Sequence, residues 1–152
     1  MKEIERKFLV KNDDYKLEAD RIYHIIQAYL NRDPARTVRI RIQNGQGFLT
    51  IKGRSNTSGT TRFEWEKEIP LEEAQVLLDL AEPGVIEKVR YIIPLPNGLK
   101  FEVDEFLGEH TGLTLAEIEL PTENTPFPKP DWLGKEVTGQ KEYYNAWLSQ
   151  AK

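Results

Sequence analysis

The sequence predicts an α+β fold in which eight antiparallel strands close into a barrel, a tunnel with a charged interior and a few helices packed outside. Two observations lead to this prediction. About eight segments have the β-branched and aromatic composition of strands, and closure removes the exposed edges of so many antiparallel strands. In seven of these segments charged residues alternate with apolar ones, so the sheet has one apolar face and one charged face.

The overall composition limits the class of protein. The 152 residues predict a single domain over residues 1–152, long enough to bury a hydrophobic core. The net charge of -4 argues against a general attraction to nucleic acid or to an anionic membrane, so neither is an expected partner. The sequence has no cysteine, which excludes disulfides and thiolate chemistry. It shows no signal peptide and no stretch of transmembrane length, so we expect a cytoplasmic protein.

The strands follow one another closely along the chain. They are expected at residues 2–10, 21–30, 37–43, 48–53, 62–69, 87–95, 99–106 and 113–120. Asn44-Gly45 and Pro96-Asn97-Gly98 are turn sequences that predict hairpins between the strands on either side of them.

Two segments are predicted as helices. In residues 71–81, Ala74, Leu77, Leu78 and Ala81 recur at helical spacing, and Pro83-Gly84 follows as a stop signal. Residues 141–150 form the second candidate helix. The Pro-rich residues 121–132 are expected to form an extended connection.

The charged faces of the strands carry both signs of charge. The basic set is Lys7, Arg39, Arg41, Lys52, Arg62, Lys88 and Arg90, and the acidic set is Glu3, Glu5, Glu64, Glu66, Glu102, Asp104, Glu117 and Glu119. An ordinary solvated sheet face explains any one strand, but such faces usually include Thr, Ser, Gln and Tyr. If the charged face instead lines a barrel, each buried ion costs several kcal/mol unless water and a charged ligand compensate it.

The two sets of charges together indicate a metal and a polyphosphate. Arginine donates two parallel hydrogen bonds to phosphate oxygens, and lysine adds point charges. Carboxylates face a polyanion only through an intermediary cation, and hard oxygen ligands suit Mg²⁺ or Mn²⁺. The spacing therefore predicts a site in which metal lies between carboxylates and phosphates.

The N-terminal "EIERK" resembles the ExExK signature of the CYTH superfamily, the triphosphate tunnel metalloenzymes. Further similar motifs run through nearly the whole chain in the order "VRIRIQ", "LTIKG", "RFEWEKEI", "EKVRY", "FEVDEF" and "AEIEL". The C-terminal "GKEVTGQKEYYNAW" resembles the segment that closes these tunnels. The short chain is most similar to the bacterial inorganic tripolyphosphatase type.

This resemblance implies roles for individual residues. Glu3, Glu5, Glu117 and Glu119 would hold Mg²⁺ or Mn²⁺, with Glu64, Glu66, Glu102 and Asp104 as further ligands of metal or water. Lys7, Arg39, Arg41, Lys52, Arg62 and Arg90 would bind phosphates. Lys88, paired with Tyr29, would activate water, although Tyr29 is equally well an ordinary strand aromatic. A base at Lys88 needs a lowered pKa, which neighbouring cations favour.

The expected activity is metal-dependent hydrolysis of inorganic triphosphate to pyrophosphate and phosphate by a monomer or homodimer. Three alternatives remain open at this point. Cyclase-type relatives share ExExK and convert ATP to cyclic AMP, and other relatives hydrolyse thiamine or nucleoside triphosphates. A non-catalytic polyphosphate-binding module is the third, but it would not need the repeated carboxylates.

Overall fold

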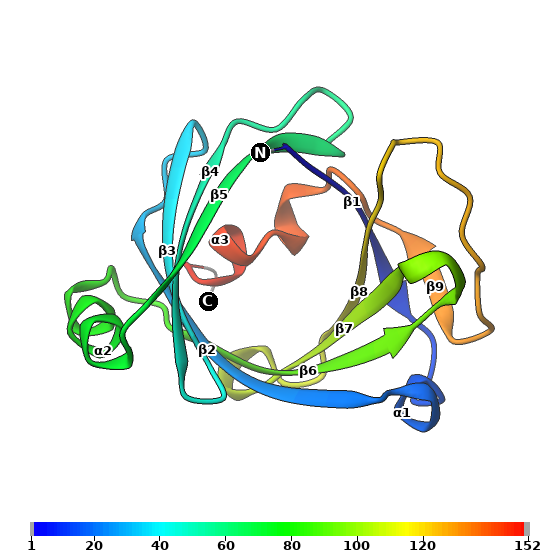
Figure 1. Ribbon diagram of the computed structural model, residues 1–152, viewed down its shortest axis with the longest axis horizontal. Coiled ribbons are helices and arrows are strands. Elements are labelled where there is room, and N and C mark those ends of the chain that lie inside the picture. Colours follow the sequence, from blue (N-terminus) through cyan, green and yellow to red (C-terminus); the bar gives the residue numbers. More distant parts are fainter. Residues whose placement is uncertain (1, 151–152) are drawn as a thin grey trace.

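In the part of the chain that the structure describes, nine strands form one antiparallel sheet, and eight of them close it into a barrel (Figure 1). The computed structural model describes residues 2–150. The strands are β1 (Lys2–Val10), β2 (Arg21–Asn31), β3 (Arg36–Gln43), β4 (Gln46–Gly53), β5 (Thr61–Ile69), β6 (Ile86–Pro94), β7 (Lys100–Phe106), β8 (Thr114–Glu119) and β9 (Leu133–Glu136). All eight predicted strands are confirmed. The ninth, β9, is four residues long and was not predicted.

The first strand closes the barrel because it pairs with β8 on one side and with β5 on the other. Its register brings residues of opposite charge together, with Glu3 opposite Arg62 and Lys7 opposite Glu117. Beyond the β5 pairing, β9 adds to β1 at Phe8 and Val10. Because side chains alternate along each strand, this register directs the charged faces of β1, β5 and β8 to the inside.

Helices α1 (Tyr15–Glu18) and α2 (Leu71–Leu80) pack outside the barrel, as predicted for the fold (Figure 1). The predicted helix at 71–81 matches α2 within one residue, whereas α1 was not predicted. Gly47 of β4 allows α2 to approach closely, because a Cβ atom at this position would lie 2.6 Å from the Cβ of Ala74. No helix within residues 2–150 has the length and apolar character needed to cross a membrane.

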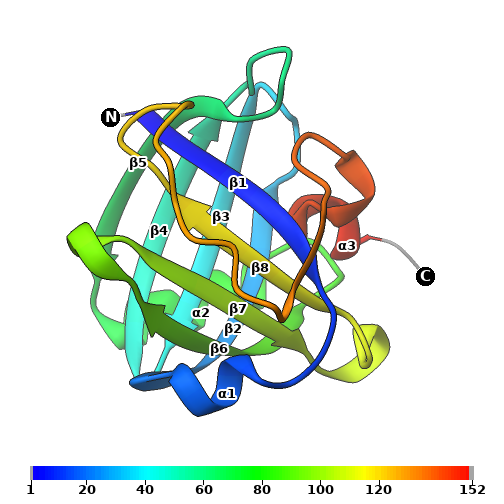
Figure 2. The ribbon, with the colours of Figure 1, turned by 90° about the vertical axis from the view of Figure 1, so that its right-hand side faces the viewer.

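The largest hydrophobic core also lies outside the barrel wall. Phe101 of β7 is fully buried, and its ring meets those of Trp132 and Phe127 at 5.2 Å and 6.0 Å between centroids. Trp132 in turn packs against Tyr15 of α1. The Pro-rich connection thus covers the outer face of the sheet, where it crosses the strands in Figure 2. As predicted, this connection contains no helix or strand over residues 121–132.

The C-terminal segment, residues 141–150, lies across one end of the barrel instead of outside it, with α3 (Asn145–Leu148) within the ring of strands (Figure 1). The predicted continuous helix over these residues is wrong. A 3₁₀ turn, η3 (Lys141–Tyr143), is separated from α3 by the extended Tyr144. The break has a physical reason, because the carbonyl oxygen of Tyr143 accepts a hydrogen bond from Lys7 instead of a helical one. Two further 3₁₀ turns, η1 (Pro96–Gly98) and η2 (Gly108–His110), lie in connections.

Candidate active site

A cavity of about 930 Å³ lies inside the barrel, and nearly all of the predicted site residues line it. They are Glu3, Glu5, Lys7, Tyr29, Arg39, Arg41, Lys52, Arg62, Glu64, Glu66, Arg90, Glu102, Glu117 and Glu119. Among the described residues predicted for the site, Lys88 and Asp104 are the two that do not contribute to the cavity surface. The alternation along the strands therefore predicted the tunnel lining, and a solvated outer face is wrong for these residues.

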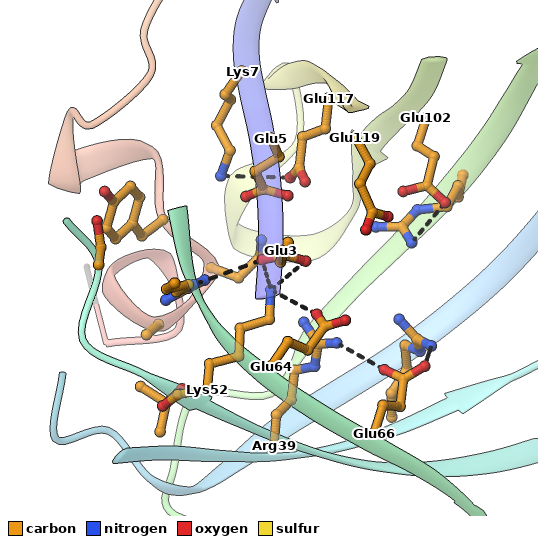
Figure 3. Close-up of a pocket in the computed structure, with 18 of the residues that line it drawn as sticks. Glu3, Glu5, Lys7, Arg39, Lys52, Glu64, Glu66, Glu102, Glu117 and Glu119 are labelled. Atoms are coloured by element: carbon orange, nitrogen blue, oxygen red, sulfur yellow. Dashed lines mark hydrogen bonds and ion pairs between the residues drawn. The ribbon is translucent and has the colours of Figure 1, made fainter. Parts of the chain in front are cut away.

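The two signs of charge meet at the end of β1 (Figure 3). Lys52 Nζ lies 2.9 Å from Glu3 Oε1 and 3.4 Å from Glu64 Oε2, and Arg62 Nε lies 3.7 Å from Glu3 Oε1. Burial raises the pKa of Glu3, but the charge of Lys52 and a hydrogen bond with Glu64 more than offset it, so the pKa is lowered. Glu64 takes the opposite shift. Burial and the hydrogen bond with Glu3 raise its pKa to about 7.

A second acidic group lies deeper along β1 and β8 (Figure 3). Glu5 is directly opposite Glu119 in the strand register, and its side chain hydrogen-bonds to Glu117. Burial, followed by the charges of Glu117 and Glu3, raises the pKa of Glu5 to about 8. The pKa of Glu117 is lowered, because Lys7 at 3.5 Å and the Glu5 hydrogen bond outweigh the effect of burial. The pKa of Glu5 is thus raised and that of Glu117 lowered, because two adjacent carboxyl groups disfavour the ionisation of each other.

The opposite wall of the tunnel carries the arginines of β3. Arg39 and Arg41 both approach Glu66, at 3.8 Å and 3.3 Å, and Arg39 also donates to the hydroxyl of Thr50. The Nε atoms of both arginines are buried, and neither has a hydrogen-bond partner in the described part of the chain. Burial and the nearby Arg39 lower the pKa of Arg41 to about 10. Unpaired buried donors are rare, so these guanidinium groups are suited to an anionic ligand.

Lys88 and Asp104 form a buried cluster on the inner face of the sheet, where Arg90 and Asn145 cover them. Asp104 accepts two hydrogen bonds from Arg90, at 2.8 Å and 2.9 Å, and lies 2.8 Å from Lys88 Nζ. Although burial raises its pKa, the charges of Arg90 and Lys88 lower the pKa of Asp104 to about 2. Burial is the main reason that the pKa of Lys88 is lowered to about 8, and Arg90 contributes in the same direction. Among residues 2–150, the side chains that hydrogen-bond to Lys88 are Asp104 and Asn145, and Tyr29 is not one of them.

The carboxylates are the groups that could hold a metal ion. In the described structure, no three acidic or histidine side chains are already gathered around one point as ligands. The donor set nevertheless fits a divalent cation, because Glu3, Glu5, Glu64, Glu117 and Glu119 line one cavity. The pKa values of Glu5 and Glu64 are raised, and a cation could replace the protons that these groups retain. Mg²⁺ keeps several waters and needs only one or two carboxylates, so it does not require a closed protein cage.

Some residues in or next to the cavity were not predicted as site residues. Thr50 on β4 does not line the cavity, but it is fully buried and donates to the cavity residue Glu66 at 2.7 Å, and its place on the same face as Lys52 was the available signal. Tyr144 and Asn145 come from the C-terminal segment. The Tyr144 ring lies 5.4 Å from Lys7 Nζ and 5.8 Å from the guanidinium carbon of Arg62. No strand periodicity reaches this segment, so alternation could not identify these two residues.

The fold and the site define a class of protein, a closed antiparallel barrel that encloses a channel with one basic and one acidic wall. Residues 1–149 match the CYTH domain. An inorganic triphosphatase of Acetivibrio thermocellus is 50% identical over 148 residues, which cover 97% of this chain and 92% of that protein. An inorganic triphosphatase of Nitrosomonas europaea is 36% identical, and the match covers 98% of this chain and 97% of that protein. The chain therefore belongs to the CYTH domain family.

Solved structures support the same assignment of the fold. A crystal structure of an inorganic triphosphatase superimposes with a TM-score of 0.67 at 33% identity, and the match covers 98% of both chains. A protein of Pyrococcus horikoshii OT3 superimposes with a TM-score of 0.65 at 25% identity over 80% of both chains. The resemblance of "EIERK" and the later motifs to the CYTH superfamily is thus confirmed.

Proposed function

We propose that this chain is a metal-dependent hydrolase that cleaves inorganic triphosphate to pyrophosphate and phosphate. The observation that carries the proposal is a single cavity whose lining includes Arg39 and Arg41 on one wall and Glu5, Glu117 and Glu119 on another. A linear polyanion with bound divalent cations complements both walls at once. The two relatives at 50% and 36% identity, each named as an inorganic triphosphatase, support the same reaction.

The basic side chains hold the substrate in this proposal. The unpaired Nε donors of Arg39 and Arg41 would bond to phosphate oxygens, and Lys52 and Arg62 would add charge nearer to β1. Lys7 and Arg90 complete the predicted phosphate-binding set. Transfer of a phosphoryl group to water depends mainly on alignment and on charge stabilisation, and a fixed row of cations supplies both. The water oxygen forms a bond to the terminal phosphorus, the bond to the bridging oxygen breaks, and pyrophosphate leaves.

The carboxylates would hold Mg²⁺ or Mn²⁺ in this proposal. Glu5, Glu117 and Glu119 form one group of donors and Glu3 and Glu64 the other, with Glu66 and Glu102 further along the wall. When bound, such an ion supplies positive charge against the charge that develops on the phosphate oxygens. We propose a different role for Asp104, because Arg90 and Lys88 already occupy both of its oxygens. It would fix these two cations in place.

Lys88 and Tyr29 remain the proposed pair that activates water. Tyr29 lines the cavity, whereas Lys88 is fully buried. In the observed arrangement Asn145 Oδ1 lies 3.0 Å from Lys88 Nζ, so Lys88 would act on a water molecule next to the Asn145 amide. The lowered pKa of Lys88, about 8, suits a group that takes up a proton close to neutral pH.

A second candidate activity is hydrolysis of nucleoside or thiamine triphosphates. The observation in its favour is that Tyr23 and Phe48 also line the cavity, with the guanidinium carbon of Arg41 4.9 Å from the centre of the Phe48 ring. An aromatic ring beside a cation can stack on a planar organic group. Inorganic triphosphate remains the first choice because both walls of the cavity carry charged side chains and because the relatives at 50% and 36% identity are named as inorganic triphosphatases.

A phosphate-release panel tests the proposal. Tripolyphosphate, ATP, thiamine triphosphate and pyrophosphate are each supplied with Mg²⁺ or Mn²⁺, and products are also separated to detect cyclic AMP. We expect the highest kcat/KM with tripolyphosphate. With EDTA in place of the metal, we expect no turnover of any of the four substrates. Cyclic AMP from ATP would assign the chain to the cyclase type, and binding without release of phosphate would indicate a polyphosphate-binding module. Cell fractionation tests the accompanying expectation of a cytoplasmic enzyme.

A further inference from the structure

The side-chain oxygen of Asn145 is fully occupied by two donors from the barrel wall. Lys88 Nζ lies 3.0 Å from Asn145 Oδ1, and Gln27 Nε2 lies 3.1 Å from the same atom. Lysine has no acceptor, so the atom of the Asn145 amide that faces it must be the oxygen. A carbonyl oxygen has two lone pairs, and these two contacts use both.

The two donors are buried beneath Asn145, whereas Asn145 itself belongs to the cavity surface. Lys88 is 0% exposed and Gln27 is 1% exposed, while Asn145 is half-buried and lines the cavity. Lys88 and Gln27 both approach the oxygen of the planar amide group. The NH₂ group is the other substituent of the amide carbon and points away from these two donors. This NH₂ group has no hydrogen-bond partner in residues 2–150 and is not among their buried unpaired atoms. It therefore has two free donors, on a residue that lines the cavity.

The residues on either side of Asn145 are fixed to the barrel. Lys7 Nζ donates to the carbonyl oxygen of Tyr143 at 3.0 Å, and Arg32 Nε donates to Ser149 Oγ at 2.8 Å. His110 Nε2 lies 2.6 Å from the carbonyl oxygen of Leu148. The position of the Asn145 amide is thus set both by its own oxygen and by the residues around it.

We propose that Asn145 is a substrate-binding residue whose amide NH₂ donates to a phosphate oxygen of the polyphosphate, and that Lys88 and Gln27 orient it. This inference rests on the proposed function and adds a contact from the C-terminal segment to the contacts made by the strands. A neutral donor suits this place, because Lys7 and Arg62 already supply charge next to the same segment. The C-terminal segment is then part of the binding site as well as a closure of the barrel.

Two substitutions separate the donor from the acceptor of Asn145. Asn145→Asp keeps an oxygen for Lys88 and replaces the NH₂ group by a second oxygen, which repels phosphate. Asn145→Leu keeps the size and removes both polar ends. Glu142→Gln is the matched control, because Glu142 is exposed in the same segment and does not line the cavity. Thermal unfolding of each variant shows whether the fold is retained.

The readout is calorimetric binding of bis(methylene)triphosphonate with Mg²⁺, a triphosphate analogue that cannot be hydrolysed. A lost hydrogen bond to a charged group corresponds to about a 10- to 100-fold weaker Kd, and we expect at least this for both Asn145 variants and no change for Glu142→Gln. Wild-type affinity in Asn145→Asp would overturn the assignment of the donor, whether or not Asn145→Leu binds weakly. An unmodified chain that does not bind the analogue would overturn it as well. If the unmodified chain binds the analogue but releases no phosphate from tripolyphosphate, the proposed hydrolysis fails while Asn145 is still judged by binding.

Discussion

Lys52 Nζ lies 2.9 Å from Glu3 Oε1, so a side chain from β4 neutralises one from β1 across the intervening strand β5. The same lysine lies 3.4 Å from Glu64 on β5. This contact explains how a barrel tolerates a charged interior, because a buried ion with a partner of opposite sign costs less than an isolated one. Two features of the lining remain available to a ligand, namely the adjacent carboxyl groups of Glu5 and Glu117 and the Nε atoms of Arg39 and Arg41, which have no hydrogen-bond partner in the described residues. These are the groups on which the predictions below act.

Removal of the Glu5 carboxylate is expected to nearly abolish turnover with Mg²⁺. Glu5 lies in the acidic group with Glu117 and Glu119, and Glu5→Ala removes one of the donors proposed for the metal. The measurement is kcat for tripolyphosphate over a range of Mg²⁺ concentrations. Glu68→Gln is the control, because Glu68 is an exposed residue of β5 that does not line the cavity. Near-normal activity of Glu5→Ala would show that the acidic wall does not hold the metal.

Loss of one β3 arginine is expected to weaken substrate binding more than it slows the reaction. Arg39→Ala removes a guanidinium group that lies in the cavity with an unpaired Nε. A hydrogen bond to a charged group is worth about 1.5–3 kcal/mol, so KM for tripolyphosphate should rise about 10- to 100-fold. The measurement is steady-state kinetics of Arg39→Ala, with Arg36→Ala as the control variant. Arg36 is on the same strand but is exposed and lies outside the cavity. Equal effects of the two substitutions would indicate a general influence of charge and not a phosphate contact.

Stabilisation by metal is expected to increase with pH. Burial and neighbouring carboxylates raise the pKa of Glu5 from 4.5 to about 8, and that of Glu64 is raised to about 7. The folded chain therefore keeps protons on these groups at pH values where the unfolded chain has lost them. The stability that the two groups contribute to the folded state is full below pH 4.5 and is lost as the pH rises through 7 to 8. A divalent cation that replaces the protons binds more tightly in that window. The rise in Tm on adding Mn²⁺ in place of EDTA should thus be larger at pH 8.5 than at pH 6.

The pH dependence has its own control in Glu5→Gln. This variant has no carboxyl group to titrate at position 5, so much of the difference between the two pH values should disappear. A metal-induced shift in Tm that is equal at pH 6 and pH 8.5 in the unmodified chain would be evidence against metal at these carboxylates.

The outer core is expected to control stability without affecting the site. Phe101 is fully buried against Trp132 and Phe127, and it points away from the tunnel. Phe101→Ala should lower the free energy of unfolding by about 3–5 kcal/mol, as large-to-small changes of buried aromatics do. Urea unfolding measures the loss, and KM for tripolyphosphate measured at low temperature should stay unchanged. A large rise in KM of the folded variant would mean that the outer core sets the tunnel geometry.

Much of the barrel could be predicted because each strand carries its own pattern. Arg39 and Arg41 alternate with Val38, Ile40 and Ile42, and this local signal alone decides which side chains share a face. Which of the two faces of the sheet turns inward is decided when the sheet closes into a barrel. This closure depends on the pairing of β1 with β5. The amphipathic spacing of α2 was likewise readable from its own residues.

The remaining features depend on contacts between distant segments, which periodicity does not encode. Strand β9 has only four residues and exists because β1 offers it an edge. The break in the C-terminal helix at Tyr144 depends on Lys7, which lies far away in the sequence. For the same reason the alternation placed Lys88 and Asp104 on the inner face correctly but could not show that Arg90 and Asn145 cover them.

The most direct test is a crystal structure of the chain soaked with Mn²⁺ and bis(methylene)triphosphonate, with anomalous scattering used to locate the metal. We predict manganese within bonding distance of carboxylates on β1 and β8, at Glu5, Glu117 or Glu119, and phosphonate oxygens between the metal and Arg39 and Arg41. Manganese and the analogue bound only outside the barrel, with the tunnel carboxylates unliganded, would contradict the account.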